Sequence, residues 1–239
     1  MSRTSNSRKM SGFQKLSYLL NKEAREYWHL YVSCDIDLSN ILEETKDQAR
    51  TSSIFLKAIG HTLRKNLEEF PQLNAELLTF PYKRVRYFNF IGANIPFLRE
   101  VNGELIFSAG IINDIDRKSL KELDLEIEQK KKGHAKEQLF IYKMPICIMK
   151  LLFFISKYFD KYRKKYRGTF VFIKVPEEFS EVYTSPNATL QFVLHEAREG
   201  KTCKLSITAD HRLLHIGIIK KFISDLKEVL EKEPVALLK

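Results

Sequence analysis

LSITADHRLLH, residues 205–215, is the stretch of this sequence that decides the fold. Its first half alternates between apolar and polar residues, which predicts a β-strand. That strand brings Asp210, His211 and Arg212 to its end, and the pattern over residues 216–230 is typical of a helix. A histidine at the end of a strand, followed at once by a rigid helix, suits a positioned general base.

Length and composition predict a folded protein with one main domain. The chain has 239 residues, with 44% hydrophobic and 29% charged residues, enough for one sizeable domain or at most two small ones. Residues 1–11 are polar and basic with no apolar segment behind them, so we expect a disordered basic arm there and a single domain over residues 12–239. Cys34, Cys147 and Cys203 form no Cys-x-x-Cys pair, which favours buried free thiols and a cytoplasmic location.

The net charge of +10 leaves two interpretations open. The Lys and Arg residues are spread along the chain among 30 acidic residues, with dense runs only at 130–132 and 161–167. Solvated helix ends and loops explain such runs. An electropositive surface that attracts an anionic cofactor is the alternative. No recognised nucleic-acid-binding motif is present, so we expect no nucleic-acid partner.

Strands and helices are predicted to alternate along the rest of the chain. Strands are expected over residues 28–37, 85–90, 104–112, 168–175 and 190–197, and helices over residues 52–69 and 117–132 and after Pro145. Asp116 is expected to cap the helix over 117–132, and Asn102-Gly103 is a hairpin turn signal. This alternation indicates the α/β class.

Residues 146–159 are strongly apolar and precede a basic cluster. A membrane span needs about 20 apolar residues, and Lys150 and Lys157 interrupt this segment, so we expect no span. A buried or subunit-facing helix is the favoured interpretation. A helix lying on a membrane surface, with its lysines reaching back to water, is the less favoured alternative.

The stretch around His211 resembles the Asp-His-Arg-x-x-Asp-Gly signature of the dihydrolipoyl acyltransferases of 2-oxo acid dehydrogenase complexes, whose fold chloramphenicol acetyltransferase shares. Other segments resemble that family in the same order along the chain. They are HLYVSCDID (29–37), FLKA (55–58) with EFPQLNA (69–75), DRKSL (116–120), GTF (168–170) and the closing helix over 222–230. The resemblance covers residues 12–238.

The resemblance implies a chloramphenicol acetyltransferase-like two-layer α/β fold, in which a mixed sheet packs against helices. It also implies a homotrimer whose active site is a channel at the subunit interface, entered by coenzyme A from one side and by the acceptor from the other. Because the chain begins directly with the catalytic region, we expect no lipoyl domain and no subunit-binding domain.

The function expected from this resemblance is the transfer of an acyl group from an acyl-coenzyme A thioester to an unknown acceptor. His211 is the candidate general base, since histidine is the side chain that most readily accepts and returns a proton at neutral pH. Asp210 and Arg212 are expected to shape the loop. Thr208 and Lys174 are candidates for polarising the oxyanion, and Lys174 also for binding the cofactor. The histidines at 29, 61, 134 and 195 have no metal-ligand spacing, so we expect no metal.

The sequence departs from the family signature at three positions. His215 stands where the family has its loop-holding Asp, Ile216 where it has Gly, and Ile173 where it has the oxyanion-stabilising serine. Losing one oxyanion donor costs on the order of 100- to 1000-fold in rate. The alternative function is therefore a catalytically degenerate trimer of the same fold that binds a ligand or serves as a scaffold.

Overall fold

The computed structural model describes residues 9–45, 50–101, 104–133, 140–175, 182, 187–195 and 202–232. Three sequence predictions fall outside these residues: residues 1–8 of the basic arm, the Asn102-Gly103 turn, and residues 196–197 of a predicted strand. His134 also lies outside them.

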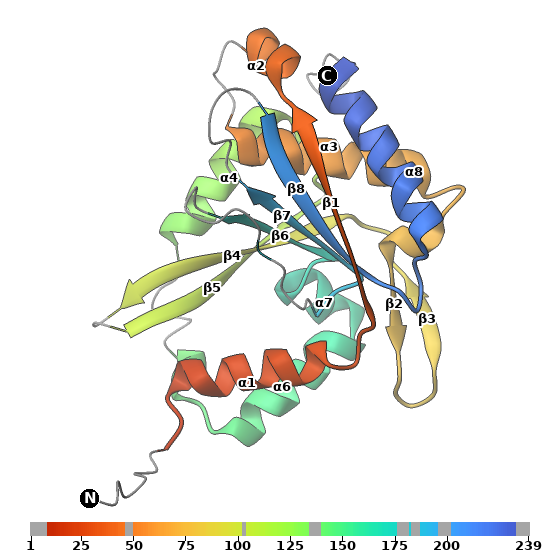
Figure 1. Ribbon diagram of the computed structural model, residues 1–239. Helices are drawn as coiled ribbons and strands as arrows, with labels where there is room; N and C mark the ends of the chain where they lie inside the picture. The colour runs from red at the N-terminus through yellow and green to blue at the C-terminus, as the bar shows by residue number, and fades with distance from the viewer. Residues whose placement is uncertain are drawn as a thin grey trace, which may run out of the picture.

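A mixed six-stranded sheet forms the centre of the molecule, as the resemblance implies (Figure 1). Its strand order is β1-β8-β7-β6-β4-β5, and the β4–β6 and β6–β7 pairs are parallel whereas the other pairs are antiparallel. The strands are β1 (His29–Asp37), β4 (Gly92–Val101), β5 (Glu104–Asn113), β6 (Phe170–Val175), β7 (Leu190–His195) and β8 (Thr202–Asp210). A separate two-stranded sheet pairs β2 (Ala75–Leu78) with β3 (Arg84–Tyr87).

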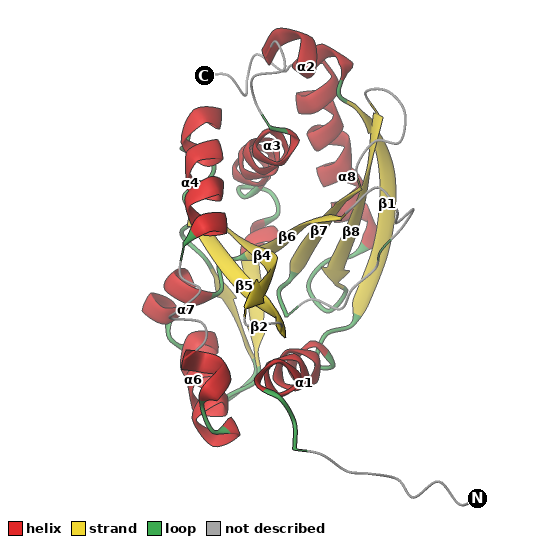
Figure 2. Ribbon diagram, turned by 90° about the vertical axis from the view of Figure 1, so that its left-hand side faces the viewer, coloured by secondary structure: helices red, strands yellow, loops and turns green. Residues whose placement is uncertain are grey.

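The helices fall into two groups (Figures 1 and 2). The first group packs against one face of the sheet: α3 (Thr51–Asn66), α4 (Leu120–Lys132) and α8 (Ile216–Lys227), with a π-helical turn (Glu228–Lys232) continuing α8. The second group gathers at the opposite end, beside β5: α1 (Gly12–Ala24), α6 (Ile146–Tyr158) and α7 (Asp160–Tyr166). The short elements are α2 (Ser39–Thr45) and a 3-10 turn (Pro71–Asn74).

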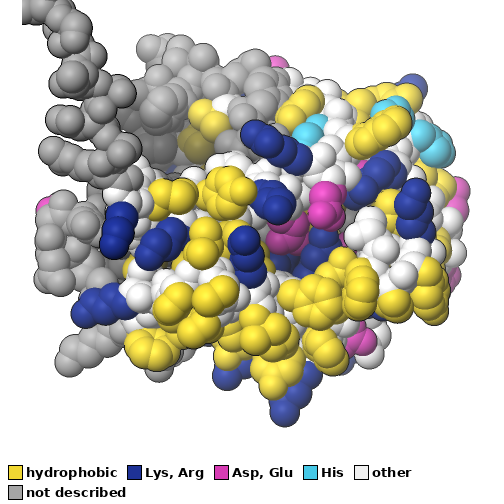
Figure 3. Space-filling view, turned by 90° about the horizontal axis from the view of Figure 1, so that it is seen from below, with side chains coloured by type: hydrophobic (Ala, Val, Ile, Leu, Met, Phe, Trp, Pro, Cys, Tyr) yellow, Lys and Arg dark blue, Asp and Glu magenta, His cyan; other side chains and the backbone are white. Residues whose placement is uncertain are grey.

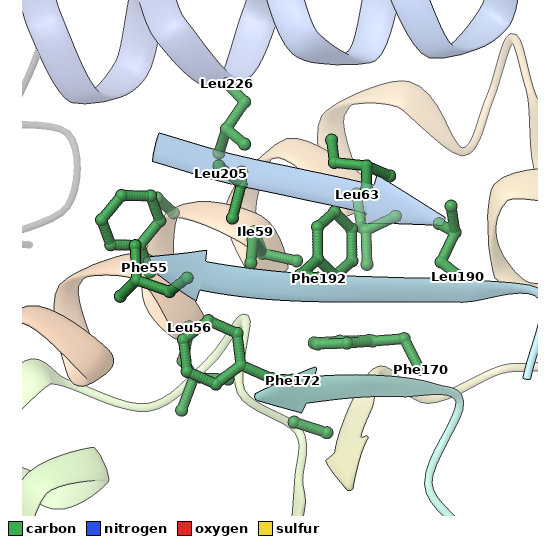
Figure 4. Packing of buried hydrophobic residues seen from close by; sticks show 14 of the residues in the cluster. Phe55, Leu56, Ile59, Leu63, Phe170, Phe172, Leu190, Phe192, Leu205 and Leu226 are labelled. Carbon is green, nitrogen blue, oxygen red and sulfur yellow. The ribbon is translucent and has the colours of Figure 1, made fainter. Parts of the chain in front are cut away.

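The hydrophobic core lies between the sheet and α3 and α8 (Figure 4). Every second residue of β7 and β8 points into it, because successive strand side chains face opposite sides of a sheet. Phe192 is fully buried, with its ring 5.3 Å from that of Phe170 and 5.8 Å from that of Phe222. The other face of β8 carries Ser206, Thr208 and Asp210, so the two faces differ sharply in polarity.

Two sequence predictions differ from the structure in this part of the chain. Asp116 does not cap α4: Ser119 does, in a capping box with Glu122, and Asp116 binds Arg64 instead, with 2.8 Å between Oδ2 and Nη2. The helix therefore begins at Leu120, three residues after the predicted start. Strand β4 was not predicted, since Pro96 interrupts its pattern and proline is uncommon inside strands.

The three cysteines are free, but the expectation that all are buried is wrong. Cys203 is buried and Cys34 half-buried, whereas Cys147 is exposed on α6. Burial raises the pKa of the Cys34 thiol to about 11. Cys147 is thus the accessible thiol of the chain.

Candidate active site

His211 follows the last residue of β8, as predicted, and a tight turn fixes its backbone. Its N–H donates to the carbonyl of Trp28, just before β1, at 2.6 Å. The N–H groups of Leu213 and Leu214 both donate to the Asp210 carbonyl at 3.0 Å, which closes the turn before α8 begins. The backbone on both sides of His211 is thereby held to the sheet.

The imidazole of His211 is oriented by one hydrogen bond. Its Nδ1 lies 3.0 Å from the carbonyl oxygen of Leu214. A carbonyl can only accept, so Nδ1 carries the proton and donates it, and the Nε2 of the neutral ring keeps its lone pair. The side chain is exposed, so Nε2 is accessible to another molecule. This is the arrangement that a general base requires.

Asp210 and Arg212 form a clamp beside His211. The Asp210 carboxylate is fully buried and accepts from the Arg212 guanidinium, at 2.9 Å from Nε to Oδ1 and 2.7 Å from Nη2 to Oδ2. The Arg212 backbone N–H also donates to Oδ1 at 3.1 Å. The carboxylate is thus occupied by the side chain and the backbone of Arg212 within the turn that carries His211.

The clamp is tied to a second group of charges through an aromatic ring. The Arg212 guanidinium lies 4.9 Å from the centre of the Tyr27 ring, and the Tyr27 hydroxyl donates to Glu76 Oε1 at 3.2 Å. Glu76 is fully buried on β2 and pairs with Arg163 at 2.9 Å and Arg86 at 2.8 Å. Burial alone would raise the pKa of Glu76, but the two guanidinium groups outweigh it and hold that pKa below its usual value.

The same group of charges extends to α1 and α6. Arg167 binds Glu23 at 2.7 Å, and Lys157 lies 3.5 Å from Glu23 and 2.9 Å from Glu26. Burial alone would lower the pKa of Lys157, but the two glutamates raise it above its usual value. We call the buried charges of Glu23, Glu76, Lys157, Arg163 and Arg167 the ion cluster. Sequence reasoning missed it, because its members are scattered over four elements.

Thr208 lies close to His211 along β8, but its side chain is buried. Only 1% of the residue is exposed, and its strand neighbours are Tyr31 on β1 and Gln191 on β7. Thr208 and Asp210 share the face of β8 that points away from the hydrophobic core. The structure therefore places Thr208 beneath the clamp, within the sheet.

Lys174 lies at the other end of the sheet from His211. It is exposed on β6 and aligned with Leu194, which is aligned with Leu205 on β8. Leu205 precedes Asp210 by five residues, which corresponds to about 17 Å along the strand. One copy of the chain therefore does not bring Lys174 and His211 together.

Lys174 instead lines a groove of about 560 Å³ between α3, α4 and the sheet. Arg50 and Lys131 also line it, beside the apolar side chains of Phe97 and Phe172. Arg50 forms an ion pair with Glu128 at the same groove. The groove thus combines an apolar floor with cationic side chains.

The structure also shows where the three positions that depart from the family signature lie. Ile173 is half-buried on β6 beside Val193 of β7. His215 precedes α8 as its N-cap residue without a side-chain capping bond, and Ile216 is 56% exposed. Among the described residues, no three His, Cys, Asp or Glu side chains are grouped so as to hold a metal ion.

No protein-family model and no curated protein sequence matches this chain. Solved structures do match over nearly its whole length. A probable dihydrolipoamide acetyltransferase from Listeria monocytogenes 4b F2365 is 17% identical with a TM-score of 0.66, covering 96% of this chain and 95% of its own. A truncated catalytic core of the 2-oxoacid dehydrogenase multienzyme complex from Thermoplasma acidophilum is 22% identical with a TM-score of 0.65, covering 96% and 99%.

A chloramphenicol acetyltransferase is 13% identical with a TM-score of 0.50, and the match covers 97% of this chain and 100% of that protein. These likenesses confirm the fold that the resemblance implied: this chain has the chloramphenicol acetyltransferase-like fold of the acyltransferase catalytic cores. At such low identity they show the fold alone.

Proposed function

We propose that this protein is an acyltransferase that moves an acyl group from an acyl-coenzyme A thioester to an acceptor, with His211 as the general base. The observation that carries the proposal is the hydrogen bond from His211 Nδ1 to the Leu214 carbonyl, which leaves an exposed Nε2 ready to take a proton. The fold supports it, since the neighbours named above are described as acetyltransferases or as a catalytic core.

The chemistry follows from the position of Nε2. A bound thioester supplies the acyl group. Nε2 takes the proton from the thiol, hydroxyl or amine of the acceptor as that group attacks the thioester carbonyl. When the C–S bond breaks, the His211 imidazolium returns the proton to the departing sulfur, so the base is regenerated. The bond from Nδ1 and the Asp210–Arg212 clamp hold the ring in place throughout.

Lys174 is the proposed contact for coenzyme A. The groove that it lines with Lys131 suits an anionic cofactor, because lysines can pair with phosphate groups while Phe97 and Phe172 offer an apolar surface. Arg50 of the same groove is already paired with Glu128. Thr208 is enclosed in the sheet, so we assign the polarisation of the oxyanion to Lys174 rather than to Thr208.

This assignment requires a second copy of the chain. Within one copy, Lys174 lies about 17 Å along the strand direction from Asp210, the residue before His211. A common site therefore needs Lys174 of one subunit and His211 of another. We therefore propose a homotrimer. Light scattering at micromolar concentration should give three times the mass of one chain, and a monomer would contradict the shared site.

The function is tested with a panel of acyl-coenzyme A thioesters and candidate acceptors, by following the release of free thiol. His211→Ala should lower the rate at least 100-fold, the usual contribution of a general base. His215→Ala is the matched control, because that exposed histidine lies four residues further along the chain and makes no capping bond. Equal rates for His211→Ala and the unchanged protein would refute the assignment of the base.

A second candidate function is a non-catalytic trimer that binds a ligand. It is favoured by Ile173, a side chain with no hydrogen-bond donor where the resembling family has its oxyanion-stabilising serine. Calorimetry distinguishes the two candidates: binding of coenzyme A without thiol release from any thioester of the panel would support the ligand-binding trimer.

A further inference from the structure

Helix α6 carries apolar side chains on its outward side as well as on its inward side. Met149 points inward and is 1% exposed, as expected for a helix that packs on its neighbours. The outward side is apolar as well, with Ile148 44%, Leu151 57% and Phe154 39% exposed. A contiguous exposed apolar surface on a protein normally marks a contact with another molecule. No described residue covers the outward face of α6.

The turn between β2 and β3 continues this surface. Phe80 is 55% exposed, and its ring meets the ring of Phe154 edge-on at 5.4 Å. Phe159, which follows α6, is 54% exposed. We call the resulting surface the α6 patch; it consists of Phe80, Ile148, Leu151, Leu152, Phe154 and Phe159. Viewed from this end of the molecule, hydrophobic side chains gather with Lys and Arg side chains among them (Figure 3).

Unpaired positive charges flank the α6 patch. Residues 140–168 contain eight Lys or Arg residues and one acidic residue, Asp160. Lys157, Arg163 and Arg167 are paired in the ion cluster, and Lys164 is paired with Asp114. Asp160 is bound to Arg86 at 2.8 Å. Lys150 and Lys161 are exposed and form no ion pair with a described carboxylate. The patch is thus an apolar surface flanked by cations whose charge the described part of the chain does not neutralise.

We propose that the α6 patch docks on the surface of an anionic lipid bilayer, with α6 lying in the plane of the interface. Apolar side chains on one face and lysines beside them are what an interfacial helix presents to the acyl chains and to anionic headgroups. No helix among the described residues is long and apolar enough to cross a membrane, so the contact is with the surface.

A second copy of the chain is the competing occupant of the α6 patch. Pairing two such patches would bring the unneutralised Lys150 and Lys161 of one copy close to those of the other, and like charges in an interface are unfavourable. An anionic membrane neutralises the same charges. The sign of the charge therefore favours the bilayer over a patch-to-patch pair of copies. The homotrimer proposed above does not require such a pair, because each interface of a cyclic trimer joins two different surfaces.

Vesicle sedimentation tests the proposal on the full chain. The protein should sediment with vesicles of phosphatidylcholine and phosphatidylserine at low salt, and much less with phosphatidylcholine alone or at high salt. Replacing both lysines, Lys150→Gln with Lys161→Gln, should weaken binding about 25-fold, since each lysine near the surface contributes about fivefold. Lys121→Gln with Lys220→Gln removes the same charge from α4 and α8, and should weaken binding much less.

The apolar part of the contact has its own matched pair of variants. Leu151→Ser should weaken vesicle binding about tenfold. Leu125→Ser, at a leucine that is 56% exposed on α4, should leave it unchanged. Cys147 supplies a direct readout, because it is the exposed thiol on α6: a polarity-sensitive fluorophore attached there should shift to shorter wavelength when anionic vesicles are added.

Three results would overturn the proposal. The first is a failure of the unchanged protein to sediment with anionic vesicles at low salt. The second is equal binding by the α6 and α4 variants. The third is slow labelling of Cys147 in the native protein together with dissociation of the Leu151→Ser variant into monomers, which would identify the α6 patch as a contact between copies. The acyltransfer assay does not enter these measurements, so the two proposals can fail independently.

Discussion

Two regions of this molecule are stabilised by different physical means. On one side of the sheet, α3 and α8 pack on β6, β7 and β8 through a core of aromatic and aliphatic side chains (Figure 4). On the other side, α1, α6 and α7 are held by the ion cluster, whose contacts join residues far apart in the chain, such as Glu23 and Arg167. We call these the apolar layer and the ionic layer. Apolar contacts need no charged partner and tolerate acid, whereas each buried charge depends on its partner remaining ionised.

The largest expected effect is in the apolar layer. Phe192→Ala removes a fully buried ring that contacts Phe170 and Phe222, and it should lower the free energy of unfolding by about 4 kcal/mol. The loss should be the same at pH 7 and pH 4, because no titrating group is involved. Urea unfolding measures it, with the exposed Tyr87→Ala as a control that should change stability little.

This contrast also explains what could be predicted from sequence. The hydrophobic periodicity of residues 52–69 and 205–230 was enough to place α3, β8 and α8, because an apolar face is a local pattern. His211 was placed at the end of its strand for the same reason. The hydrogen bond from His211 Nδ1 to the Leu214 carbonyl and the ion pair between Asp210 and Arg212 could not be predicted, because both depend on the folded geometry of the turn.

The ionic layer could not be predicted, since a lysine or glutamate on the surface and one in a buried pair look alike in sequence. Arg163 and Arg167 belong to a run that was interpreted as a solvated or cofactor-attracting surface, yet both are buried in ion pairs. The partners of Arg163 and Arg167 lie 87 and 144 residues away. Ser119, by contrast, could have been recognised as the cap of α4, because Ser119 and Glu122 have the spacing of a capping box and Asp116 has no Glu or Gln three residues later.

The second prediction concerns a variant that removes one charge from the ionic layer. Glu76→Gln leaves Arg163 buried without its charged partner and should lower the free energy of unfolding by about 3 kcal/mol at pH 7. The lowered pKa of Glu76 means that its charge stabilises the fold above the unfolded pKa of about 4.3, and that this contribution is lost as the pH falls through the lower, folded value.

The difference in the free energy of unfolding between Glu76→Gln and the unchanged protein should therefore become smaller in acid. The corresponding difference for Phe192→Ala should not change with pH. Urea unfolding at a series of pH values tests this, with the exposed Glu68→Gln as the matched control. If the difference in unfolding free energy between Glu76→Gln and the unchanged protein stays constant down to about pH 3, the Glu76 charge does not stabilise the ionic layer.

The smallest effect concerns the capping boxes of two helices: α4, which packs on the hydrophobic core, and α1 of the ionic layer. Ser119 caps α4 in a box with Glu122, and Ser11 caps α1 in a box with Gln14. Replacing either serine with alanine should lower the free energy of unfolding by about 1 kcal/mol at pH 7. Hydrogen bonds from Ser119 lower the pKa of Glu122, so that its box loses strength as the pH falls through this lowered value, whereas Gln14 does not titrate.

The cost of Ser119→Ala should therefore shrink in acid, and the cost of Ser11→Ala should persist until the ion cluster itself is protonated. Urea unfolding of both variants at pH 7 and in steps toward pH 3 separates these responses, and circular dichroism follows the helices in the same samples. If Ser11→Ala costs nothing at pH 7 while Ser119→Ala does, then α1 separates from the sheet before the rest of the molecule unfolds. The ion cluster would then hold α1 less tightly than the hydrophobic core holds α4, because buried charges must recover their desolvation before they add to stability.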